Sequence, residues 1–90
     1  MLALGKVYAS IGAIAAFAEA IDSDSPGTYL ARHANGDWGE LDDDDRMANE
    51  YALRHGLRVL SVYRLSTGVE IWLLTESDRS TTTILLPSEY

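Results

Sequence analysis

Apolar side chains recur at every third or fourth position in the first half of the chain, and this spacing predicts two or three short helices. The first helix is expected over residues 11–21, with Ser10 before it as the N-cap. Its inward face should consist of the apolar side chains that recur at helical spacing, which are Ile11, Ile14, Ala15, Phe17, Ala18 and Ile21.

Helix start and stop signals delimit the second and third helices. Ser25-Pro26 is typical of a helix start and Asn35-Gly36 of a helix stop, so a second helix is expected over residues 26–34. The third helix should begin after Asp42 as the N-cap and end at Gly56. Its buried stripe is expected to comprise Met47, Ala48, Tyr51, Ala52 and His55.

After Gly56 the pattern changes from helical spacing to alternation. Strands are expected over residues 57–65, 69–75 and 80–86, joined by short turns, which implies a three-stranded antiparallel meander. Residues 5–9 favour an additional short strand near the N-terminus. The helices should cover one face of the sheet, and the few polar positions on the other face suggest either dimerisation through the sheet or cover by the N-terminal strand. The prediction is a single α+β domain over residues 1–90.

Composition and charge narrow the classes of protein that fit this fold. The 47% of hydrophobic residues argue for a small globular core. The formal charge of -7 disfavours direct binding to nucleic acid and suits either a basic protein partner or simple solubility. The absence of cysteine excludes disulfides and thiol chemistry. No apolar run reaches the ~20 residues of a membrane span and no secretory signal is recognisable, so a cytoplasmic protein is expected.

The stretch from His33 to Asp45 has the most unusual composition. Its candidate recognition residues are Asp37, Trp38, Glu40, Asp42, Asp43, Asp44 and Asp45. Carboxylates can bind magnesium or calcium, but four consecutive aspartates point in different directions on a helical turn and depart from the calcium-loop pattern. We therefore favour a solvated helix start, and we expect no metal or cofactor. Trp38 either packs in the core or anchors a partner.

No arrangement of residues in the sequence indicates catalysis. His33 and His55 are predicted near the ends of two helices, but no spacing rule pairs them with a carboxylate. No serine has a nucleophile-elbow context, and there is no glycine-rich phosphate loop. Residues 76–79 are typical of a turn whose side chains bond to backbone groups, and Arg79 is a candidate partner for Asp37 or for another acid across the fold. We expect a protein without enzymatic activity.

Three strings of residues resemble a family of short bacterial proteins found on plasmids, phages and integrated elements. They read HANGDWGELDDDDRMANEYAL, GLRVLSVYRL and WLLTESDRSTTTILLPSEY, and they lie within the last two-thirds of the chain. Their HAxGDWG and TExDRSxTxxLLPxEY patterns are distinctive in combination. The first third matches more loosely, because Ser10-Ile11-Gly12-Ala13 stands where relatives have a Thr-Pro-Gly-Ala-like helix start. The resemblance implies an accessory protein of mobile DNA and brings no known reaction or catalytic residue.

Two functional hypotheses follow. The first is a non-enzymatic inhibitor whose acidic face occupies a basic surface of a host defence nucleoprotein complex, either a CRISPR effector or a restriction enzyme. Its carboxylates would stand in for DNA phosphates, as in a DNA mimic. The second is a homodimeric accessory or regulatory module, assembled through the sheet, in which the acids are only solvated. A small metal-dependent enzyme is a distant third.

Overall fold

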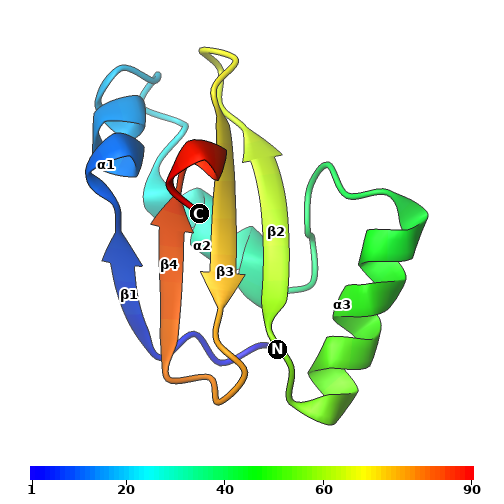
Figure 1. The fold of residues 1–90 in the computed structure, drawn as a ribbon. Coiled ribbons are helices and arrows are strands. Elements are labelled where there is room, and N and C mark those ends of the chain that lie inside the picture. The colour runs from blue at the N-terminus through cyan, green and yellow to red at the C-terminus, as the bar shows by residue number, and fades with distance from the viewer.

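The computed structural model describes residues 1–90 as a four-stranded sheet surrounded by three helices (Figure 1). Strands β2, β3 and β4 form the predicted antiparallel meander, and β1 pairs with β4 in parallel, giving the order β1-β4-β3-β2. The α+β class and the N-terminal strand are therefore confirmed. In chain order the elements are β1 (Lys6–Ala9), α1 (Ile11–Ala18), α2 (Pro26–Ala34), α3 (Asp43–His55), β2 (Val59–Arg64), β3 (Glu70–Thr75), β4 (Thr81–Leu85) and a 3₁₀ turn, η1 (Pro87–Glu89).

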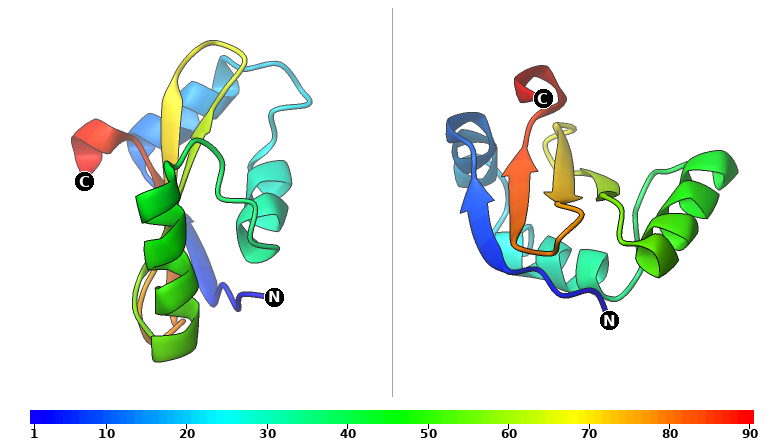
Figure 2. Two further views of the ribbon diagram at one scale, coloured as in Figure 1. Left: turned by 90° about the vertical axis from the view of Figure 1, so that its right-hand side faces the viewer. Right: turned by 60° about the horizontal axis from the view of Figure 1, so that its bottom comes forward.

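The helices occupy three different positions around the sheet. Helix α2 crosses one face, and the turn η1 lies on the opposite face, as the edge-on view in Figure 2 shows. Helix α1 lies at the end of the sheet where β1 stops, and α3 lies outside the edge strand β2 (Figure 1). The longest helix, α3, has 13 residues, and no helix combines the length and apolar character needed to cross a bilayer.

The main core lies between α2 and the sheet face that it covers, and α1 closes this core at one end of the sheet (Figure 1). Alternation along the strands places Tyr63 of β2 and both Ile71 and Leu73 of β3 on this face, each at most 1% exposed. The complete main cluster comprises Ala13, Ala16, Tyr29, Tyr63, Leu65, Ile71, Leu73 and Ile84. A smaller cluster, formed by Leu2, Trp38, Ala52 and Val59, holds α3 and the N-terminal segment against the edge of the sheet.

The inward face of α1 differs from the prediction. Ala13 and Ala16 are buried, whereas Ile11 and Ile14 are 87% and 59% exposed, and the helix ends at Ala18 rather than at residue 21. Because none of the eight residues of α1 is polar, the spacing of apolar positions does not favour one face over another. The small alanines face inward, which leaves the isoleucines on the outside.

The C-terminal residues cover part of the sheet face opposite α2. The Tyr90 ring lies edge-on to Trp72, with 5.4 Å between the ring centroids. Glu89 accepts hydrogen bonds from the Ser10 hydroxyl and from the Gly12 N–H, the latter at 3.0 Å. Strand β1 extends the edge of the sheet instead of covering its face, so the predicted cover by the N-terminal strand is wrong. The C-terminal segment supplies this cover.

Candidate partner-binding surface

The connector between α2 and α3 is fixed against β2, with Trp38 buried beneath it. The Trp38 carbonyl accepts a hydrogen bond from the Val62 N–H at 3.1 Å, and the Glu40 N–H donates to the Val62 carbonyl at 2.7 Å. Gly39 has φ of 74°, and a Cβ there would lie 1.9 Å from the Val62 carbonyl oxygen, so only glycine fits. The Trp38 side chain is 5% exposed. It is a core residue that packs with Leu2, Ala52 and Val59.

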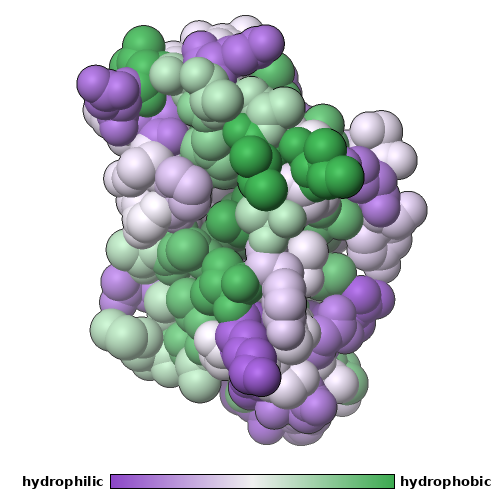
Figure 3. Space-filling model, turned by 90° about the vertical axis from the view of Figure 1, so that its left-hand side faces the viewer, coloured by the Kyte–Doolittle hydropathy of each residue, from purple (hydrophilic) through white to green (hydrophobic).

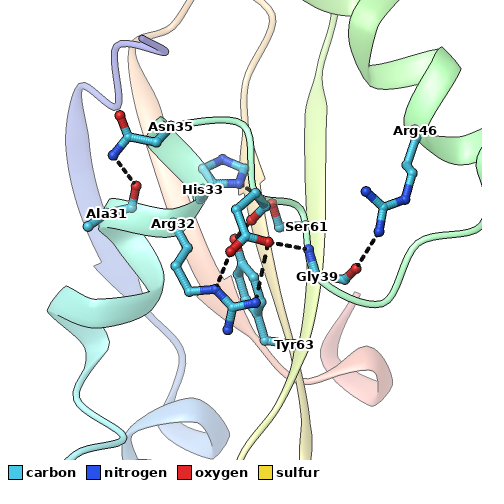
Figure 4. A network of polar contacts seen from close by, with 9 residues as sticks. Ala31, Arg32, His33, Asn35, Gly39, Arg46, Ser61 and Tyr63 are labelled. Carbon is cyan, nitrogen blue, oxygen red and sulfur yellow. Dashed lines mark hydrogen bonds and ion pairs between the residues drawn. The ribbon is translucent and has the colours of Figure 1, made fainter.

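Asp37 and Glu40 are exposed, but an arginine lies beside each of them. Arg32 donates to both carboxylate oxygens of Asp37, at 2.7 and 3.3 Å, and this hydrogen bonding lowers the pKa of Asp37. Figure 4 shows the Arg32 guanidinium beside the connector. The Glu40 carboxylate lies 3.5 Å from the Arg64 guanidinium. Local cations therefore neutralise much of the charge of these two predicted recognition residues.

Both ends of α3 are fixed by hydrogen bonds. Asp42 is the predicted N-cap, and its carboxylate accepts a bond from the Asp45 N–H at 2.8 Å. At the other end, Arg79 donates to the Ala52 carbonyl at 3.0 Å and to other backbone carbonyls nearby. The expected pairing of Arg79 with Asp37 is wrong, because the guanidinium is used by the backbone of α3 and its turn.

The side chains of Asp43, Asp44 and Asp45 are exposed and take part in no ion pair. Successive residues lie about 100° apart around a helix, so the three carboxylates diverge. No group of three or more His, Asp or Glu side chains is placed to hold a metal ion. Arg46, the next residue, donates to the Gly39 carbonyl at 3.1 Å (Figure 4). The first turn of α3 thus presents three charges that no cation of the chain pairs with.

The buried face of α3 is narrower than predicted. Only Asn49 and Ala52 are buried, while Met47 and Tyr51 are 68% and 57% exposed. The Asn49 amide pairs with the backbone of Leu60, donating to its carbonyl at 2.7 Å and accepting from its N–H at 3.2 Å. Helix α3 therefore runs along the edge of β2 and seals it, instead of covering a face of the sheet. A helix in this position buries a thin stripe and leaves its other apolar residues in solvent.

Acidic and apolar side chains of α3 adjoin one another on its outer side. A shallow hollow of about 560 Å³ is lined by Asp43, Arg46, Met47, Glu50, Tyr51 and Arg54. Beside it, the Tyr51 ring stacks on His55 with 4.0 Å between centroids, and Glu50 lies 3.9 Å from Arg54. We call this hollow together with the acidic first turn the α3 surface, consisting of Asp43, Asp44, Asp45, Arg46, Met47, Glu50, Tyr51 and Arg54.

His33 is in a buried polar network away from the α3 surface. Its Nε2 lies 2.8 Å from the Thr75 hydroxyl, and its Nδ1 lies 2.5 Å from the Ser61 hydroxyl. The Thr82 hydroxyl donates to the Leu4 carbonyl, so Thr82 accepts from Thr75, and Thr75 accepts from His33 Nε2–H. His33 Nδ1 is left as the acceptor for Ser61.

This network is structural. His33, Ser61 and Thr75 are each 0% exposed, so no substrate can reach the Ser–His contact without opening the core. Burial lowers the pKa of His33 to about 4, which keeps the imidazole neutral near pH 7. His33 and His55 lie in different parts of the fold and form no pair.

Comparison with known proteins assigns no function to the chain, so the candidate site is chosen from the geometry of the structure. No protein-family model matches the chain, and no curated protein or solved structure matches it either. The functional candidate is therefore the α3 surface, which combines unpaired carboxylates with exposed Met47 and Tyr51 on one firmly held helix. Of the seven recognition residues predicted from the sequence, only Asp43, Asp44 and Asp45 belong to it; Asp42 serves as the cap.

Proposed function

We propose that the protein is a non-enzymatic binding protein whose α3 surface occupies a basic surface of a partner protein. The observation that carries the proposal is the exposure of Met47 and Tyr51 beside carboxylates that the chain leaves unpaired. Carboxylates attract a basic partner over long range, and exposed aromatic and methionine side chains supply apolar contact once the partner has docked. The predicted partner patch contains Lys or Arg around an apolar centre.

The resemblance to proteins of mobile elements indicates the class of partner. Such elements meet host defence complexes that hold DNA or RNA in grooves lined by Lys and Arg, and carboxylates can take the place of the phosphates there. We therefore propose a CRISPR effector or a restriction enzyme as the partner. Binding should weaken as salt increases, because part of the attraction is between charges exposed to solvent.

The test compares two variants that each remove two negative charges. D43N/D44N alters the α3 surface, whereas E19Q/D22N alters exposed acids after α1 and serves as the matched control. Cells that carry a CRISPR or restriction system and express each variant are transformed with a plasmid that the system targets. Wild type and E19Q/D22N should rescue transformation, and D43N/D44N should rescue at least about tenfold less, equivalent to about 1.4 kcal/mol of binding.

A second variant pair separates charge from contact. M47A/Y51A should weaken binding to the purified defence complex at every salt concentration, whereas D43N/D44N should make the binding less dependent on salt. Full rescue by D43N/D44N would contradict recognition through the acids. No rescue by wild type with any such system would contradict the proposed partner class.

The alternative function is a homodimeric accessory or regulatory module in which the acids are only solvated. A specific feature favours self-association, because the sheet has one uncovered edge with apolar residues around it. This feature lies at the opposite side of the sheet from α3 (Figure 1). A dimer formed there and a partner bound at the α3 surface are therefore compatible.

A further inference from the structure

The two edges of the sheet differ in how their backbone groups are used. At the β2 edge, Val62 exchanges hydrogen bonds with the connector, and Leu60 pairs with the side chain of Asn49. These contacts occupy the outward-facing N–H and C=O groups of Leu60 and Val62, the two central outward-facing residues of the strand. A sealed edge of this kind cannot accept a further strand.

The β1 edge has no such cover. Lys6 N–H donates to the Ser80 carbonyl and Ser10 N–H to the Ile84 carbonyl, both at 2.9 Å, so the even-numbered residues of β1 bond towards β4. Alternation along a strand then directs the N–H and C=O groups of Val7 and Ala9 away from the sheet. All four residues of β1 are exposed. The strand has no proline, and its single charged residue, Lys6, is at its first position.

Helix α1 continues this open edge as an apolar surface. A helix that is apolar all round is normally buried, yet the exposed side of α1 carries Ile11 and Ile14, 87% and 59% exposed. Figure 3 shows hydrophobic side chains gathered on this side of the molecule, over β1 and α1. We call it the β1–α1 surface, consisting of Val7, Tyr8, Ala9, Ile11, Ile14, Ala15 and Ala18, which are all exposed.

We propose that the β1–α1 surface binds a second copy of the chain, with the two β1 strands antiparallel across a twofold axis near Tyr8. Val7 of each copy would then face Ala9 of the other, and their free backbone groups would form about four hydrogen bonds. The two four-stranded sheets would become one sheet of eight strands. Lys6 would lie opposite Ser10 of the second copy, so no like charges meet at the junction.

The distribution of charge favours a second copy of the chain as the partner that binds the β1–α1 surface. The surface offers no cluster of charge to a strongly acidic or basic partner, since its seven residues are all uncharged. Each copy has a net charge of -7, but the acidic α3 lies beyond the opposite edge of the sheet (Figure 1). With strands about 4.8 Å apart, the acids of the two copies are separated by several times the Debye length of about 8 Å. Repulsion between the acidic helices therefore does little to oppose this arrangement.

The area required is modest. A standard interface removes about 800 Å² from each partner, which is about 15% of the 5205 Å² surface of this chain. In the antiparallel arrangement, α1 of each copy lies beside the start of β1 of the other. Ile11 and Ile14 would thus gain cover from the second copy, and the strand pairing and the helix contacts form one continuous interface.

Sedimentation equilibrium and light scattering over a dilution series test the proposal with two matched variants. I11K/I14K adds two charges to the β1–α1 surface, whereas M47K/Y51K adds two charges to exposed apolar positions of α3. Wild type and M47K/Y51K should be dimers, and I11K/I14K should be a monomer. A monomeric wild type, or a dimer that M47K/Y51K abolishes and I11K/I14K does not, would overturn the proposal.

A backbone variant tests the strand pairing directly. V7P removes an N–H that points away from β4 and so bonds nothing within one copy. It should therefore give a monomer with the circular dichroism spectrum of the wild type. If V7P does not fold, I11K/I14K still tests whether the β1–α1 surface forms the dimer. Amide exchange then tests the strand pairing, because it should be slow at Val7 and Ala9 in the dimeric wild type and fast in I11K/I14K. Fast exchange at both amides in a dimeric wild type would contradict the strand pairing.

Discussion

Acidification should destabilise this protein through His33 before most of its carboxylates are protonated. The imidazole is 0% exposed and accepts a hydrogen bond from the Ser61 hydroxyl at Nδ1. A second proton would have to occupy Nδ1, which would break this bond and place a charge in the core without a counter-ion. Burial of the ring, which disfavours the charged form, lowers the pKa of His33 from 6.5 to about 4 on folding.

The sign and size of the effect follow from this lowered pKa. Above pH 6.5 the imidazole is neutral in both the folded and unfolded chain, so the free energy of unfolding has its full value. Between pH 6.5 and about 4 only the unfolded chain binds the proton, so stability falls as the pH falls. The loss reaches about 2 kcal/mol at pH 5 and about 3 kcal/mol below pH 4, which is a large part of the stability of a small domain.

Urea unfolding of wild type and H33Q across this pH range measures the loss. Glutamine can still donate and accept hydrogen bonds but does not titrate, and the carboxylates affect both proteins alike. The stability advantage of wild type over H33Q should shrink by about 2 kcal/mol between neutral pH and pH 5. H55Q, which alters the histidine stacked on Tyr51, is the control and should follow the wild-type curve.

Two results would refute this reasoning. One is a difference between wild type and H33Q that stays constant over the pH range. The other comes from an NMR titration of the folded wild type, in which His33 would be observed to gain its proton near pH 6.5. The titration does not depend on whether H33Q folds.

Three further predictions concern stability and are checked by urea or thermal unfolding. Gly12→Ala should destabilise by about 1 kcal/mol despite the helix propensity of alanine, because its Cβ would lie 2.7 Å from both the Glu89 carboxylate and the Leu86 side chain. An E89A background removes one of these two clashes and should reduce the cost without abolishing it. Asp42→Ala should cost about 1 kcal/mol by uncapping the Asp45 N–H, and an unchanged urea midpoint would contradict this. Arg79→Ala should lower Tm, with a cost of about 1–3 kcal/mol from lost bonds to backbone carbonyls.

The sequence by itself determined where most elements begin and end. Helix α2 spans residues 26–34 as predicted, and α3 begins after Asp42 and is followed by Gly56 in the left-handed conformation. These signals are readable because a cap or a left-handed stop depends on contacts within three or four residues. The meander could be predicted for the same reason, because consecutive strands that are joined by short turns pair with each other.

The tertiary structure alone decided which faces of the helices are buried, and with them the candidate surfaces. Helix α1 is apolar on every side, so only its packing selected Ala13 and Ala16 for the core and left Ile11 outside. Helix α3 lies along an edge instead of a face, so Met47 and Tyr51 remain in solvent. Burial depends on contacts between segments far apart in the chain, and periodicity within one segment does not contain that information. The acidic run was visible in the sequence, but its apolar neighbours became a surface only through the position of α3 on the sheet.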